Sequence, residues 1–271
     1  MTFNTKSNLI HLERGFIYAM SHQIFICFAA EDRYKIVEPI VYHLKNYGIK
    51  TWYDRHTLLM GDNRVQKNLC EGAAKCQYAL IILSKDTEQS ICAMEEISII
   101  KKRCQNREVT IFPVLYEILP NDIPCNLQWI KEFIYKEVNR HSGTLEICNH
   151  IACKITSDMI ALCPYKTIQD ILSCSKSMYP LLHSLICKYQ KIDNNNLNSR
   201  VTMLYATYLV IIHSENISDN SMIHLISTIF ERLFSETLLN LKIDYRELWL
   251  LENSLCLLVN SYFASCTESI I

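Results

Sequence analysis

The stretch Ser90-Ile91-Cys92-Ala93-Met94-Glu95-Glu96-Ile97 follows the apolar run Tyr78–Leu83 and a short polar loop. An apolar run of this length, bounded by polar residues and flanked by helical patterns, is typical of a parallel strand in an α/β sheet. Ligands of such sheets gather at the carboxyl ends of the strands. The sequence therefore predicts that Glu96 acts on a ligand. Glu95 lies about 100° away around the helix, so the two carboxylates cannot face the same cleft.

Three more apolar runs, Gln23–Phe28, Ile49–Tyr53 and Val109–Tyr116, are separated by helical patterns. Gly48 precedes the second run and suits the left-handed cap that ends a helix. Pro113 within the last run indicates an edge position or a local irregularity. Alternating strands and helices joined by short connections predict a flavodoxin-like, doubly wound parallel sheet. We expect this α/β domain to span residues 22–162, after an N-terminal extension at residues 1–21.

The remaining residues, 165–271, contain no glycine and no strand-like alternation. Apolar residues at helical spacing predict four or five amphipathic helices in an all-α bundle. Pro180 should divide two helices or kink one. Residues 193–196 should form a turn, and Asp244 with Glu247 should form a capping box.

The composition narrows the functional class. The 271 residues carry a net charge of -1, which disfavours a nucleic-acid binder that relies on a basic surface. The 13 cysteines are dispersed, lack zinc-site spacing and follow no signal peptide, so we interpret them as reduced cytosolic thiols without a metal. No stretch is long and apolar enough to predict a membrane span. A cytoplasmic protein that binds neither nucleic acid nor membrane is expected.

Six segments in order resemble the Toll/interleukin receptor (TIR) domain of the bacterial kind. They are Ile24–Phe28 with Glu31-Asp32 after it, Gly48–Asp54, the loop that ends in Gly61-Asp62, Ile81–Ser84, the Ser90–Ile97 stretch and Pro113–Tyr116. Each segment is a weak signal alone, but their order and spacing together predict this fold for a little over half of the chain.

The resemblance implies an enzyme that cleaves the bond between nicotinamide and ribose in NAD+, with NAD+ as substrate and no cofactor. Glu96 falls on the catalytic glutamate of the family. The loop from Asp54 to Asp62 resembles the BB loop, through which TIR domains self-associate; its expected assembly residues are Leu58, Leu59, Gly61 and Asp62. The expected substrate-binding residues are Phe28, Ala30, Arg33, Trp52, Asp54, Ser84 and Cys92. Cys92 stands where the family often has Trp.

The residues themselves leave several roles open. Phe28 and Trp52 suit the core better than a stacking platform. Arg33 could contact a pyrophosphate or form a surface ion pair. Ser84 could cap a helix or contact a ligand. A receiver domain is disfavoured because Asp54 follows the second predicted strand, whereas a phosphorylated aspartate would follow the third.

One carboxylate suffices for this chemistry, because nicotinamide is a cationic leaving group that departs neutral. The carboxylate stabilises the developing positive charge at the anomeric carbon. Whether water or the adenine attacks, giving ADP-ribose or a cyclic product, stays open. So does the rival function, a non-catalytic TIR adaptor. We expect an antiphage immune effector or signal generator that is activated by assembly, with the helical bundle regulating it or binding a partner protein.

Overall fold

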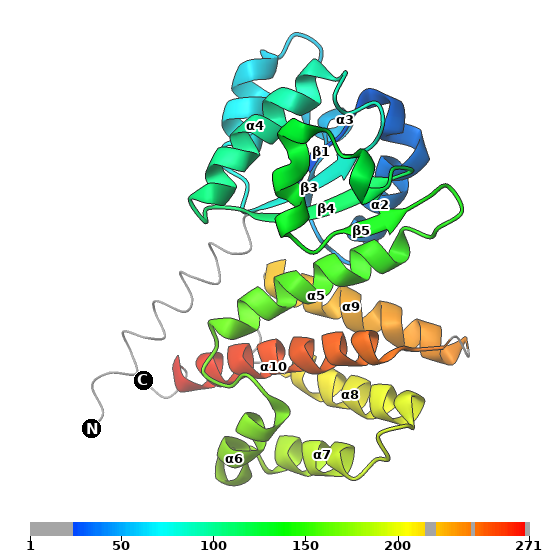
Figure 1. The fold of residues 1–271 in the computed structure, drawn as a ribbon. Helices are drawn as coiled ribbons and strands as arrows, with labels where there is room; N and C mark the ends of the chain where they lie inside the picture. The colour runs from blue at the N-terminus through cyan, green and yellow to red at the C-terminus, as the bar shows by residue number, and fades with distance from the viewer. Residues whose placement is uncertain (1–23, 215–220, 240–241, 269–271) are drawn as a thin grey trace. The chain divides into compact units, whose positions relative to one another are not determined.

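A computed structural model describes residues 24–214, 221–239 and 242–268 (Figure 1). The expected extension at residues 1–21 lies outside these ranges. The described chain divides into two compact units, one up to Ile151 and one from Ala152, so that the division falls within helix α5 (Leu145–Ala161). The domain boundaries expected at residues 162 and 165 stay a prediction.

The first unit is built on a five-stranded parallel sheet with the strand order β2-β1-β3-β4-β5. Its strands are β1 (Ile24–Cys27), β2 (Thr51–Trp52), β3 (Tyr78–Leu83), β4 (Thr110–Tyr116) and β5 (Lys136–Val138). β2 lies on one side of β1, and β3, β4 and β5 follow on the other side, as in a doubly wound sheet. The predicted α/β class is therefore confirmed, and β3 has the bounds that the apolar run indicates.

Helices cover both faces of this sheet, which explains why β1 and β3 are buried at every position. Alternate residues of these strands, Phe25 and Cys27 on β1 and Ala79, Ile81 and Leu83 on β3, pack in one core cluster with residues of η3 and α4. The helical segments of this unit are η1 (Ala30–Asp32), η2 (Arg33–Val37), α2 (Glu38–Asn46), α3 (Asp54–Thr57), η3 (Val65–Ala73), α4 (Ile91–Gln105), η4 (Pro120–Asp122), η5 (Cys125–Glu132) and the start of α5.

The predictions made from Gly48 and Pro113 had different outcomes. Gly48 has φ 70° at the end of α2, so the predicted left-handed cap is confirmed. The edge position indicated by Pro113 is wrong, because β4 lies between β3 and β5. The pairing of β4 with β5 starts at Val114, so Pro113 lies just outside that ladder and needs no hydrogen bond there.

The second unit is helical. It contains α6 (Ile168–Met178), α7 (Pro180–Gln190), α8 (Leu197–Ile212), α9 (Ser221–Leu238) and α10 (Tyr245–Glu268), with the end of α5. Pro180 is the first residue of α7, so it divides two helices as predicted. The capping box at α10 is also confirmed, since Asp244 and Glu247 accept hydrogen bonds from each other's backbone N–H. None of the described helices has the length and hydropathy that crossing a membrane would require.

Gly72 on η3 provides a test of the packing in the first unit. A Cβ there would lie 2.8 Å from both Phe25 Cε2 and Trp52 Nε1. We expect Gly72→Ala to lower the free energy of unfolding in urea by about 2 kcal/mol, because two fixed rings cannot yield as a flexible side chain can. Gly143→Ala is the matched control, since a Cβ there meets no atom within 4 Å. Equal stability of the two variants would contradict this packing.

Candidate active site

Glu96 is a buried carboxylate in the second turn of α4. Ser90 caps this helix by accepting a hydrogen bond from the Ala93 N–H, and Glu96 is 6% exposed. Its Oε1 accepts a hydrogen bond of 2.6 Å from Asn68 Nδ2 on η3. Glu95 instead faces outward and pairs with Arg64 at 2.5 Å. The two neighbouring glutamates therefore point to different sides of the helix, as the helical spacing predicts.

Burial controls the protonation of Glu96. Loss of solvation raises its pKa from 4.5 to about 7. The nearby Cys27 thiol, the hydrogen bond from Asn68 and the charge of Arg64 lower the pKa, whereas the charge of Asp54 raises it further. Near neutral pH the carboxyl group is therefore present in both its protonated and ionised forms, which suits a group that must respond to a developing charge.

Trp52 is joined to Glu96 through Asn68. The indole Nε1 donates to Asn68 Oδ1 at 3.2 Å, and Asn68 itself is buried. The Trp52 ring packs partly buried against the core cluster of the sheet, so both its edge and its ring are in contact with protein. The core interpretation of Trp52 is confirmed, and its expected contact with substrate stays a prediction.

A second group of predicted residues lies around Arg33. The guanidinium binds Asp54 through two hydrogen bonds, Nη1 to Oδ1 at 2.6 Å and Nη2 to Oδ2 at 2.7 Å. The Arg33 guanidinium carbon lies 5.0 Å from the centroid of the Phe28 ring, and Nη1 also donates to the Tyr53 hydroxyl. The ion-pair interpretation of Arg33 is confirmed, with Asp54 as the partner. A bidentate pair of this kind leaves little of the cation for a pyrophosphate.

Ser84 is buried at the end of β3, where its hydroxyl donates to Asp32 Oδ2 at 2.6 Å. The same Oγ accepts from the Asp86 N–H. The helix-cap interpretation of Ser84 is wrong, because Ser90 caps α4; Ser84 instead closes the turn between strand and helix. Ala30 is exposed at the start of η1, and its expected contact with substrate stays a prediction.

Cys92 is exposed one helical turn before Glu96, on the same face of α4. Arg64 lies near Cys92, Glu95 and Glu96, and the two carboxylates favour its charged guanidinium. Arg64 Nη2 pairs with Glu95, while Nη1 is buried without a hydrogen-bond partner. The outer side of Glu96 is therefore bordered by one thiol and one cation.

The loop after α3 is held by its own turn. The Asp62 N–H donates to the Leu59 carbonyl, and Asp62 Oδ2 accepts from the Leu59 N–H. Gly61 has φ 98°, which a turn of this kind requires and which residues with a Cβ rarely adopt. The turn leaves the side chains of Leu59 and Met60 on the surface, at 76% and 106% exposure, whereas Leu58 is half-buried.

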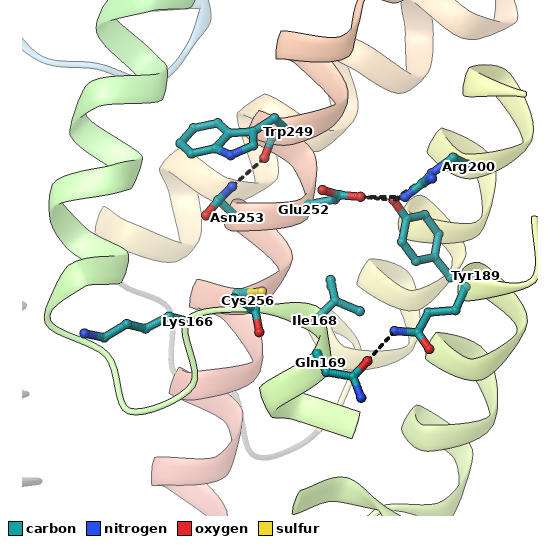
Figure 2. Close-up of a pocket in the computed structure, with 11 residues that line it drawn as sticks. Lys166, Ile168, Gln169, Tyr189, Arg200, Trp249, Glu252, Asn253 and Cys256 are labelled. Carbon is teal, nitrogen blue, oxygen red and sulfur yellow. Dashed lines mark hydrogen bonds and ion pairs between the residues drawn. The ribbon is translucent and has the colours of Figure 1, made fainter. Parts of the chain in front are cut away.

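The second unit has a separate cavity of about 320 Å³ (Figure 2). On its wall, the Tyr189 hydroxyl donates to Glu252, and Arg200 Nη2 donates to the same carboxylate at 2.8 Å. The side chains of Gln169 and Gln190 pair with each other at 2.9 Å. No residue that the sequence predicts for the site lines this cavity. Among the described residues, no three His, Cys, Asp or Glu side chains form a group that could hold a metal ion.

Sequence reasoning missed three residues of this region: Arg64, Asn68 and Met60. Arg64 and Asn68 are four residues apart, a spacing that places two side chains on one face of a helix. The sequence shows this spacing, but it does not show that both side chains contact glutamates of α4. Met60 sits between two residues of the predicted assembly loop, and only the turn geometry shows how far it projects.

Comparison with known proteins identifies the first unit. The profile described as TIR domain matches residues 24–141. A protein named NAD(+) hydrolase TcpA, from Theionarchaea archaeon, is 27% identical over 124 residues, which are 45% of this chain and 37% of that protein. Another, 2' cyclic ADP-D-ribose synthase AbTIR of Acinetobacter baumannii, is 30% identical over 102 residues, which are 38% of each protein. The chain thus matches well under half the length of these relatives.

A solved structure also aligns with this chain. It is the TIR-domain part of the structure of the activated Roq1 resistosome directly recognizing the pathogen effector XopQ. The identity is 18% and the TM-score 0.33, with 62% of this chain and 98% of the other covered.

Burial of Glu96 predicts a pH dependence of stability. Since its pKa is raised from 4.5 to about 7, the folded state holds a proton that the unfolded state has lost between these two pH values. The free energy of unfolding therefore falls as pH rises through this window, by on the order of 3 kcal/mol. We expect Glu96→Gln to be more stable than the wild type in urea at about pH 8, with a smaller difference at about pH 5. Glu88→Gln, at an exposed position of the same unit, is the control. Its stability relative to the wild type should be the same at about pH 5 and about pH 8. A stability difference for Glu96→Gln that is the same at both pH values would contradict the burial.

Proposed function

Because residues 24–141 form a TIR domain, we propose that this chain cleaves the bond between nicotinamide and ribose in NAD+. The observation that carries the proposal is the single buried carboxylate of Glu96, held by Asn68 in the helix that follows β3. The names of two relatives, a NAD(+) hydrolase and a 2' cyclic ADP-D-ribose synthase, support the substrate. In this proposal NAD+ is the substrate and no further cofactor is required.

Glu96 acts through charge and hydrogen bonding. As the bond to nicotinamide breaks, positive charge develops at the anomeric carbon and the nicotinamide ring becomes neutral. An ionised Glu96 stabilises that charge and accepts hydrogen bonds from the ribose hydroxyls, in a site from which water is largely excluded. No proton has to be given to the leaving group, so one carboxylate performs the reaction. Attack by water gives ADP-ribose, and attack by the adenine gives a cyclic product.

We assign the diphosphate of NAD+ to Arg64 rather than to Arg33. Arg33 donates two hydrogen bonds to Asp54, whereas Arg64 Nη1 has no hydrogen-bond partner and the Arg64 guanidinium lies near Glu96 and Cys92. Phosphate oxygens are strong acceptors for a guanidinium N–H. Phe28, which lies against Arg33, and Cys92, which lies near Arg64, remain proposed contacts of the substrate.

Assembly supports catalysis in this proposal. Glu96 is 6% exposed, so NAD+ reaches it only after the surrounding side chains move. The loop bears two exposed apolar side chains, Leu59 and Met60, of the kind that associate with a second copy. Contact through this loop, which continues directly into η3, would shift Arg64 and Asn68 and open the site. We further propose a cytoplasmic antiphage role as an effector or signal generator, in which the helical unit regulates assembly or binds a partner protein.

A non-catalytic adaptor is the second candidate. The observation in its favour is that Cys92 places no aromatic ring beside Glu96, while the loop still presents its apolar side chains. Such a protein would self-associate but would leave NAD+ intact.

The first test is nicotinamide release from NAD+ by concentrated protein. We expect the wild type to release nicotinamide and Glu96→Gln to lose at least about a thousandfold in kcat/KM, because the amide cannot stabilise positive charge. Since the pKa of Glu96 is about 7, kcat/KM of the wild type should rise with pH to a plateau above that value. The mass of the second product distinguishes hydrolysis from cyclisation.

Retained self-association of Glu96→Gln, measured by light scattering, shows that the loss of activity is chemical rather than structural. An inactive wild type that still self-associates at every concentration and pH would favour the adaptor.

The second test concerns the loop. We expect the double variant Leu59→Asp with Met60→Asp to weaken self-association at least about tenfold, since two charges would enter an apolar contact. The activity per molecule of the wild type should rise with protein concentration, and that of the double variant should stay low and flat. Ile134→Asp, at a residue that is 94% exposed elsewhere in the same unit, is the matched control. An unchanged concentration dependence in the double variant would exclude the loop from assembly.

A further inference from the structure

Asn68 connects two residues that lie far apart in the sequence. It is 7% exposed on η3, and both ends of its amide are in use. Nδ2 donates to Glu96 Oε1 at 2.6 Å, and Oδ1 accepts from Trp52 Nε1 at 3.2 Å. The amide thus bridges β2 and α4 beneath the catalytic carboxylate.

The Trp52 contact decides which way the amide faces. An indole N–H can only donate a hydrogen bond, so only the oxygen of Asn68 can face Trp52. The nitrogen must then face Glu96. A nitrogen donor favours the ionised carboxylate, whereas an oxygen in that place would favour the protonated acid. Trp52 therefore determines the charge state that Asn68 stabilises at Glu96.

Trp52 is itself held in place by close packing. A Cβ at Gly72, one helical turn after Asn68, would meet Trp52 Nε1 at 2.8 Å. The absence of a side chain at Gly72 is what allows the indole to lie against η3 with its N–H directed at Asn68. One face of this helix therefore holds both the ring and the amide.

We propose that Asn68 is a positioning residue for the cleavage reaction: its amide holds one oxygen of Glu96 and leaves the other for the ribose, and Trp52 fixes the direction of that amide. The inference deepens the proposed function and rests on it. It gives Trp52 a role through Asn68 rather than as a platform for the substrate.

Other groups also act on Glu96, and they are unchanged by substitutions at Asn68. The Cys27 thiol on β1, which donates to the Ala93 carbonyl, lies close to Glu96, and Arg64, the residue before η3, contributes a favourable charge. Asp54 contributes an unfavourable charge, and the Cys76 thiol lies near Cys27. Glu95 on α4 is paired with Arg64. Loss of the Asn68 donor alone should therefore raise the pKa of Glu96 without removing its charge at high pH.

The test is the pH profile of nicotinamide release by the full chain, for the wild type, Asn68→Leu and Trp52→Phe. Asn68→Leu keeps the shape of the side chain and removes the donor. We expect the midpoint of its acid limb to move up by roughly one pH unit or more, with much of the activity regained at high pH. Trp52→Phe keeps a ring and removes the N–H, so its midpoint should move in the same direction by less. Asn149→Leu, which loses another buried amide that bonds Tyr47, is the control for stability and should keep the wild-type midpoint.

Each outcome decides a separate point. Shifted midpoints in both variants, with the Asn149→Leu midpoint unchanged, support the positioning role. An active wild type whose midpoint is shared by Asn68→Leu and Trp52→Phe would overturn this inference and leave the proposed function standing. If Asn68→Leu does not fold, Trp52→Phe decides alone. A wild type that releases no nicotinamide at any pH would overturn both.

Discussion

Burial of one carboxylate against the face of a parallel sheet is the constraint on which the site depends. Glu96 lies on the side of α4 that packs toward β1, and water reaches almost none of it. Such a group loses solvation and must be compensated by donors. The protein supplies one hydrogen bond from Asn68, the nearby Cys27 thiol and one nearby cation, Arg64. The compensation is incomplete, so the pKa of Glu96 stays near neutral, at about 7.

The arrangement around Glu96 links the site to the loop before η3. The Arg33–Asp54 pair fixes the start of this loop, because it joins the helix after β1 to the first residue of α3. Asp62 and Gly61 fix the turn further along, and Arg64 and then η3, which carries Asn68, follow directly. A contact made by Leu59 or Met60 can therefore reach Glu96 through one short, continuous segment. Catalysis and assembly share the same physical elements in this account, which is why a closed site and an exposed apolar turn occur together.

Signals that act within one element could be predicted from the sequence. Spacing along the chain predicts the bounds of β3, the left-handed Gly48, the division at Pro180 and the different faces of α4 that Glu95 and Glu96 occupy. Contacts between elements could not be predicted in this way. The partner of Arg33 is 21 residues away and that of Asn68 is 28 residues away, and neither separation has a local signature. One of the two roles left open for Ser84, a helix cap, is wrong for a similar reason, since Ser84 instead donates to Asp32, 52 residues away. The short strand β5 has only three residues, too few for a periodic pattern.

The most direct test of the account is the pKa of Glu96 itself, measured by carbon-13 NMR titration of the glutamate carboxyl carbons in the full chain without substrate. The spectrum of Glu96→Gln identifies the signal that belongs to Glu96. The account predicts a midpoint near the value of about 7 that burial gives this carboxyl. A midpoint near the ordinary value of 4.5 would mean that Glu96 is solvated, and would contradict the buried carboxylate on which the proposed chemistry rests.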